Sequence, residues 1–180
     1  MSETRNEIES VAYERIVVPL DGSAIAERAL PHARTLARAI RAPIHLLRIV
    51  DITPLTELSV VGPGPEPTAV FAELEIVQTE EEAATDYLEK IRQQLNEQGL
   101  DATVEVRTGL VKAELVDAVQ PRDLVVMTTH GRTGLERLFF GSVAEEMIKH
   151  SVAPILLVRS SQAPTETPQS AALTSNVGRD

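Results

Sequence analysis

The sequence contains no cysteine and no tryptophan, and only 3% of its 180 residues are aromatic. The absence of cysteine excludes disulfides, thiol chemistry and cysteine-ligated zinc, and it is typical of proteins from a reducing compartment. Few aromatic side chains and a formal net charge of −10 argue against nucleic-acid binding, which normally uses basic patches and stacking platforms. We therefore expect no nucleic-acid partner.

Long apolar runs are also missing. No run approaches the length of a membrane span, and the first ten residues carry three glutamates where a signal peptide would carry basic residues. We expect a cytoplasmic protein without a membrane partner. The chain is nevertheless 43% hydrophobic, which is enough for one core. The expected organisation is a tail over residues 1–13, a single domain over 14–160 and a disordered, polar tail over 161–180.

Strand-like and helix-like segments alternate along this domain. Runs rich in β-branched residues predict strands at 15–20, 43–50, 101–107, 123–128 and 154–159. Apolar residues three and four apart predict helices at 24–40, 84–95, 112–119 and 142–150. The second of these helices is expected to stop at Gly99, a residue that can take the left-handed conformation that closes a helix. Pro31 predicts a kink or a restart in the first helix, and the Pro- and Gly-rich residues 51–69 predict a mobile loop. The alternation predicts an α/β fold with a mostly parallel sheet, in which ligands bind at the carboxyl ends of the strands.

The segment most suggestive of chemistry follows the fourth predicted strand. It contains Gly131, Gly134 and Gly141 and leads into a helix, whose first N–H groups and dipole attract anions such as phosphate. An internal alternative exists, because Ser142 and Glu145 have the spacing of a capping box that satisfies the same N–H groups. The residues alone leave both interpretations open.

Two other strand ends carry candidate contacts. Pro19, Leu20 and Asp21 end the first strand, where a carboxylate could accept hydrogen bonds from a ribose or an adenine amine, or hold a metal beside phosphates. The alternative is that Asp21 forms an Asp-Gly turn or a helix cap. Ile49 lies at the exit of the second strand, where backbone groups could contact a base or simply end the strand.

Signals of catalysis are weak. The four histidines show no metal-ligand spacing, and the sequence has no Gly-x-Ser-x-Gly elbow and no Walker phosphate loop. Arg132 lies close enough to the glycines to steady a phosphate, although an exposed arginine on a loop is usually only solvated. We therefore assign no catalytic residue and no metal ligand from the sequence.

Residues 15–51 and 123–159 resemble the two ends of the universal stress protein family. Nucleotide-binding members have Gly, two residues, Gly, nine residues and then Gly-Ser or Gly-Thr. Gly131 and Gly141-Ser142 match the second half of this motif, whereas Thr128 stands in the place of the first glycine. The resemblance implies a three-layer α/β/α fold of Rossmann-like, adenine nucleotide α-hydrolase-like type, with a five-stranded parallel sheet in the order 3-2-1-4-5. It also implies ATP or another adenine nucleotide as ligand, with or without magnesium.

The resemblance further implies which residues contact the nucleotide. The implied site contains Pro19, Leu20, Asp21, Ile49, Met127, Thr128, Gly131, Arg132, Gly134, Gly141, Ser142 and Val143. Within it, the glycines and the start of the last helix hold the phosphates, the end of the fourth strand lies by the ribose, and Asp21 with Ile49 meets the adenosine. A homodimer through residues 155–159 is implied as well, because this apolar edge strand needs a cover; the tail after residue 160 is the alternative cover.

Three functions follow from these observations. The first is a nucleotide-binding regulatory stress protein with an unknown protein partner and at most slow ATP hydrolysis or self-phosphorylation. The second is a protein-binding dimer that has lost its nucleotide, for which Thr128 is the discriminating residue. The third is an adenylyl-transfer enzyme on a related fold, which would need a basic or His-rich motif that Asp21-Gly22-Ser23 does not supply.

Overall fold

The structure, a computed structural model, describes residues 12–53, 67–129 and 141–159, with side chains of the long central helix described from residue 74 onward. In this part of the chain five parallel strands form one sheet in the order β3-β2-β1-β4-β5. The strands are β1 (Arg15–Pro19), β2 (Ile44–Asp51), β3 (Ala102–Gly109), β4 (Asp123–Thr129) and β5 (Ile155–Arg159). The implied strand order is confirmed, and so are the edge positions of β3 and β5.

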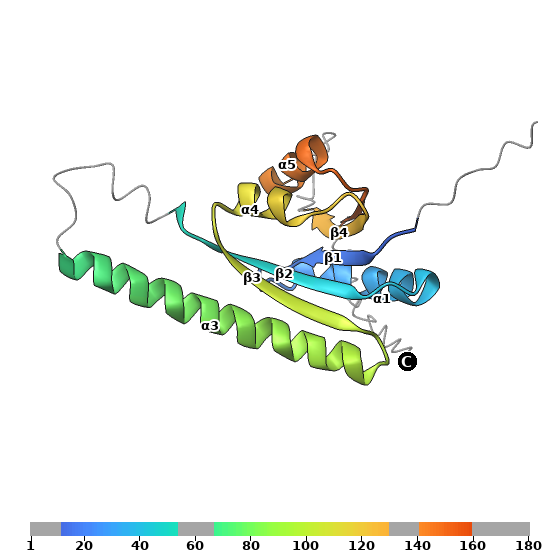
Figure 1. Cartoon of the computed structure of the whole chain (residues 1–180), viewed down its shortest axis with the longest axis horizontal. Coiled ribbons are helices and arrows are strands. Elements are labelled where there is room, and N and C mark those ends of the chain that lie inside the picture. The colour runs from blue at the N-terminus through green and yellow to red at the C-terminus, as the bar shows by residue number, and fades with distance from the viewer. Residues whose placement is uncertain (1–11, 54–66, 130–140, 160–180) are drawn as a thin grey trace, which may run out of the picture.

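Helices cover both faces of the sheet and complete the predicted three layers (Figure 1). One face carries α1 (Ala29–Ile40), with the short 3₁₀ helix η1 (Ala26–Arg28) before it, and α3 (Pro67–Glu97). The opposite face carries α4 (Val111–Ala118) and α5 (Ser142–His150). Successive strand side chains point to opposite faces, so Ile16 belongs to the core under α1 and α3 whereas Val17 belongs to the core under α4 and α5.

The first helix restarts at the proline, as predicted. The 3₁₀ turn ends at Arg28, α1 begins at Ala29, and Pro31 lies in its first turn. A proline is tolerated there because the first N–H groups of a helix have no partner within the helix. The helix ends at Arg41, the only non-glycine residue with a positive φ (57°) in the described ranges.

The expected bounds of the Pro- and Gly-rich loop and of the following helix are wrong. Residue 51 ends β2, and α3 begins at Pro67 and spans 31 residues, starting well before residue 84. Pro67 is the first residue of the helix, the position where proline fits best, so this proline starts a helix and does not belong to the expected loop. None of the helices in the described ranges is long and apolar enough to cross a membrane.

A buried ion pair joins the amino ends of β1 and β4. Arg15 donates from Nε to Asp123 Oδ1 at 2.8 Å and from Nη2 to Asp123 Oδ2 at 3.0 Å. The Asp123 residue is 1% exposed, and its Oδ2 also accepts a hydrogen bond from the Gln120 N–H at 2.7 Å. This bidentate contact holds the register of the two central strands at the end of the sheet opposite to the predicted site.

Candidate functional site at the carboxyl edge of the sheet

The chain leaves β1 through a tight turn. The Leu20 N–H donates to the Leu47 carbonyl at 2.8 Å, so pairing with β2 continues up to the turn. Asp21 Oδ1 then accepts a hydrogen bond from the Ser23 N–H at 2.8 Å, and Gly22 takes a φ of +85°. The turn interpretation of Asp21 is thus confirmed. Its side chain is also exposed, so the turn presents a carboxylate at the edge of the sheet.

Three side chains that the sequence analysis did not single out support this turn. Arg48 of β2 lies so close that a Cβ added to Gly22 would meet its Nη1 at 2.8 Å. The Arg48 guanidinium sits 5.5 Å from the centre of the Tyr87 ring, and the Tyr87 hydroxyl donates to Glu27 Oε1 at 2.9 Å. Burial, and then this hydrogen bond, raise the pKa of Tyr87, so its hydroxyl stays protonated. In the sequence, the signal that could have revealed Arg48 is an arginine within a mostly apolar strand.

The structure brings Ile49, Met127 and Val143 to one face of the sheet. All three belong to, or pack against, the core cluster under α4 and α5. Met127 is only 6% exposed and Leu20 only 3%, so both residues lie in the core and present almost no surface to a ligand. Ile49 and Val143 are partly exposed and keep apolar surface at the edge.

The start of α5 differs from the capping-box interpretation, which is wrong. Gly141 is the N-cap residue, with φ −57° and ψ 154°, and Ser142 is already the first helical residue. A capping box needs the serine at the N-cap, one position earlier in the helix frame. Glu145 instead pairs with Lys149 at 2.8 Å, and no side chain in the described ranges caps this helix. The Ser142–Glu145 capping box therefore does not compete with an anion for the first N–H groups of α5.

The remaining predicted site residues divide into two groups. Pro19 ends β1, and Thr128 lies in β4 opposite Val158 of β5, half-buried. Gly131, Arg132 and Gly134 lie outside the described residues. As for metals, the described ranges contain no group of three His, Cys, Asp or Glu side chains that could hold an ion.

The strand order places these features at a topological switch point. The winding reverses between β1 and β4, which are adjacent and parallel, so Asp21 and the chain that leads to Gly141 leave the sheet at the same edge. An exposed carboxylate, partly exposed apolar side chains and the start of a helix whose N-cap residue is Gly141 belong to this edge. Fold and site together define a doubly wound α/β protein with a candidate anion site at the carboxyl edge.

Comparison with known proteins identifies the family of this chain. Residues 12–159 match the Universal stress protein family, and the chain belongs to that family. It is 34% identical over 149 residues to universal stress protein MJ0531 of Methanocaldococcus jannaschii, covering 82% of each chain. It is 30% identical over 159 residues to universal stress protein MJ0577 of the same organism, covering 83% of this chain and 97% of the relative.

Solved structures agree with the fold. The structure of MJ0577 superposes with a TM-score of 0.68 at 26% identity, covering 85% of this chain and all of that one. Universal stress protein UspA from Lactobacillus plantarum superposes with a TM-score of 0.67 at 22% identity, covering 83% of this chain and all of that one. A universal stress protein solved in complex with cAMP gives a TM-score of 0.50 at 22% identity, covering 83% of this chain and 99% of that one.

Proposed function

We propose that this protein binds an adenine nucleotide, with ATP the first candidate, at the carboxyl edge between β1 and β4 and acts as a homodimeric regulator of the stress response. The observation that carries the proposal is the start of α5. Gly141 precedes the helix without a Cβ, and no side chain in the described ranges caps the first N–H groups. Such a helix terminus favours a phosphate through its N–H groups and its dipole.

The other described residues fit the rest of a nucleotide. The exposed Asp21 carboxylate is suited to accept hydrogen bonds from ribose hydroxyls or from the adenine amine. Ile49 and Val143 offer partly exposed apolar surface, which suits the face of a base or a sugar. The relative solved with cAMP supports the view that this fold accommodates an adenine nucleotide. When bound, ATP would supply its phosphates to the helix terminus, with or without magnesium.

The protein is proposed as a regulator and not as a rapid enzyme. Arg48 and Tyr87 hold the Asp21 turn in place, which is a positioning role. Occupancy of the site would change contacts with the second subunit or with a protein partner. Hydrolysis or self-phosphorylation, where it occurs, would be slow.

Calorimetric titration with ATP and with AMP, with and without magnesium, tests nucleotide binding. We expect wild type to bind and Gly141→Val to lose binding, because a branched side chain would crowd the approach to the first turn of α5. Gly99→Asn is the matched control, since Gly99 lies at the end of α3 with no atom within 4 Å of an added Cβ. No heat for wild type, with Gly141→Val behaving identically, would favour the protein-binding dimer that has lost its nucleotide.

Thr128→Gly separates these two functions further, because it restores the first glycine of the family motif. If the Thr128 side chain crowds the ribose, the variant binds ATP more tightly than wild type does. Equal affinities would show that threonine is tolerated at this position. Binding by the variant alone would identify Thr128 as the residue that abolished nucleotide binding.

A further inference from the structure

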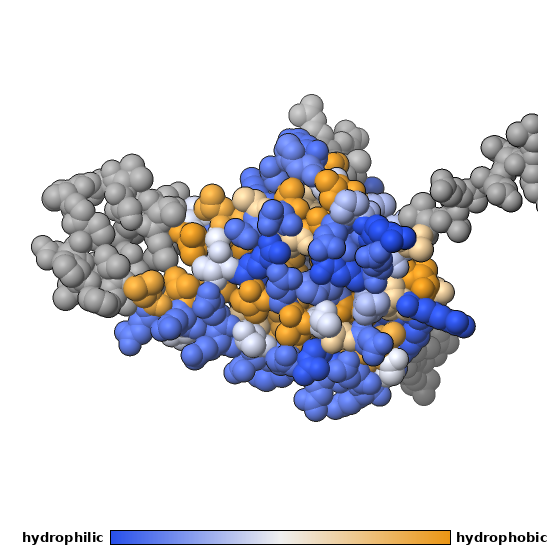
Figure 2. Space-filling model, viewed as in Figure 1, coloured by the Kyte–Doolittle hydropathy of each residue, from blue (hydrophilic) through white to orange (hydrophobic). Residues whose placement is uncertain are grey.

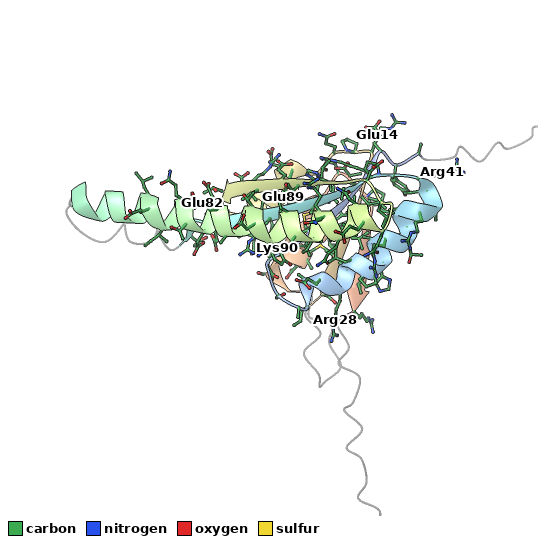
Figure 3. All side chains as sticks on the ribbon, turned by 90° about the horizontal axis from the view of Figure 1, so that it is seen from below. Glu14, Arg28, Arg41, Glu82, Glu89 and Lys90 are labelled. Atoms are coloured by element: carbon green, nitrogen blue, oxygen red, sulfur yellow. The ribbon has the colours of Figure 1, made fainter. Side chains whose placement is uncertain are left out.

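The first half of α3 extends beyond the sheet. The contact between Glu81 and the Thr108 hydroxyl ties the helix to β3 one residue before that strand ends at Gly109. The helix begins 14 residues earlier, at Pro67, which at 1.5 Å per residue leaves a projection of about 20 Å. The projecting half is visible in two perpendicular views (Figures 1 and 3).

The face that packs on the sheet continues into this projection. Ala84, Leu88, Ile91 and Leu95 are buried and repeat at intervals of four, three and four residues. The same seven-residue pattern continues toward the N-terminus at Val77 and Leu74. Leu74 is 57% exposed on this face. Ile76 is also 57% exposed, but a residue two positions further along a helix points to nearly the opposite side. Apolar side chains gather at this end of α3, next to hydrophilic ones (Figure 2).

The charges around this surface all have one sign. Residues 67–82 contain five glutamates and no lysine, arginine or histidine, and the first basic residue of the helix is Lys90. Glu75, Glu80 and Glu82 are exposed around the apolar side chains. An apolar stripe with an acidic rim is complementary to a helix with an apolar stripe and a basic rim.

We propose that Leu74 and Val77, with the surrounding glutamates, form a docking surface for a basic amphipathic helix of a partner protein. This names the chemistry of the protein partner and does not depend on nucleotide binding. A second copy of α3 is disfavoured because it would bring the same glutamates together. Residues 1–11, 54–66 and 160–180 are each acidic in net charge, so they lack the complementary charge.

The test uses the full chain without nucleotide and three labelled synthetic peptides, followed by fluorescence anisotropy. The first peptide is an amphipathic helix with leucine on one face and lysine on the other. The second has glutamate in place of lysine, and the third has the composition of the first in an order without an apolar face. We expect the basic amphipathic peptide to bind at least about tenfold more tightly than either of the others.

Variants locate the binding surface. Leu74→Ser/Val77→Ser should weaken binding of the basic peptide by about tenfold or more, because the two side chains share the face of α3 that continues beyond the sheet and Leu74 is 57% exposed. Ile148→Ser/Val152→Ser is the matched control, since Ile148 is 47% exposed and Val152 61% exposed at a distant site. Circular dichroism checks that each double variant keeps its helix content.

Several results would overturn the proposal. The first is that wild type does not bind the basic peptide. The second is that the basic peptide and the peptide without an apolar face bind equally well. The third is that the two double variants weaken peptide binding equally. A change of sedimentation coefficient in Leu74→Ser/Val77→Ser alone would assign the surface to a second copy of the chain. No binding of the basic peptide by wild type, together with intact ATP binding, would reject the docking surface and leave the proposed nucleotide function standing.

Discussion

The Asp123 carboxylate shows how much one side chain can decide in this protein. It accepts both nitrogens of Arg15 and a backbone N–H while almost completely buried. A nearby pair, Glu14 and Arg122, joins the same two strand ends with a 2.6 Å contact, but its side chains are 58% and 64% exposed. Burial and geometry distinguish the two pairs. Solvent screens the charges of an exposed pair, whereas removing one partner of a buried pair leaves an uncompensated charge and costs much more stability.

Asp123→Ala should lower the free energy of unfolding by about 3–5 kcal/mol, because it leaves the charge of Arg15 without its carboxylate partner and the Gln120 N–H without its acceptor, although Arg15 Nη2 keeps its bond to the Ala118 carbonyl. Glu14→Gln should change it by less than about 1 kcal/mol. Urea unfolding followed by circular dichroism measures both. Equal costs for the two variants would contradict the assignment of Asp123 as the main link between β1 and β4.

His45 is a second buried polar group with a defined role. Its Nδ1 lies 2.9 Å from Thr103 Oγ1, and its Nε2 lies 2.8 Å from Glu105 Oε2. Burial, followed by the charge of Arg15, lowers the pKa of His45, so the ring is neutral and donates from Nε2 to the carboxylate. Burial alone would raise the pKa of Glu105, but hydrogen bonds from Arg107 and His45 outweigh it and lower that pKa.

The sign of the resulting pH dependence follows from the lowered pKa. In the unfolded chain His45 takes up a proton near its ordinary value of 6.5, whereas the folded protein resists it until lower pH. Stability is therefore full above pH 6.5 and falls as the pH drops below that value. Unfolding of wild type and His45→Gln should show a smaller loss for the variant over this range. His150→Gln, at an exposed site, should follow wild type; parallel curves for all three proteins would refute the neutral His45.

At the scale of elements, the end of α3 is the clearest case of local sequence deciding local structure. Gly99 has a φ of +73°, its N–H donates to the Asn96 carbonyl at 2.9 Å, and the Leu100 N–H donates to the Leu95 carbonyl at 3.1 Å. These two bonds form a Schellman motif, and both leucines are buried in the same core. The predicted stop at this glycine is confirmed.

Gly99→Ala should lower the free energy of unfolding by about 1–2 kcal/mol, since an L side chain resists this left-handed conformation although space is open. Gly99→Asn should cost less, because asparagine tolerates positive φ better than alanine does. Thermal unfolding of the two variants gives the comparison. A loss for asparagine as large as that for alanine would mean that the strain does not lie in the backbone.

The elements also show where sequence patterns stop being sufficient. The strands were predicted within two residues of their bounds, because β-branched runs and turn residues are local signals. The N-terminal start of α3 was missed, because the prolines and glycines of residues 51–69 predict a loop, although Pro67 itself is the first residue of the helix. The residues around Ser142 left a capping box and an anion site both open, and only the backbone angles of Gly141, which place the N-cap one residue earlier, exclude the capping box.

At the scale of the whole molecule, β5 is an edge strand that carries Leu156 with 38% of its surface exposed. An uncovered apolar edge invites pairing with another strand, which is the physical basis for the proposed homodimer. Leu156→Lys should shift the protein toward the monomer in size exclusion with light scattering, since a lysine on an edge opposes pairing. Removal of residues 161–180 should leave the dimer intact. A wild-type monomer that is insensitive to this truncation would reject the dimer.

The sequence by itself determined the alternation of strands and helices, the stop at Gly99, the restart at Pro31 and the resemblance to the universal stress protein family, because each depends on neighbouring residues or on a short motif. Only the tertiary structure decided that Arg15 meets Asp123 across 108 positions, that Arg48 supports the Asp21 turn and that half of α3 projects past the sheet. Such contacts depend on strand register and on where the sheet ends, and neither is encoded in any local window of the chain.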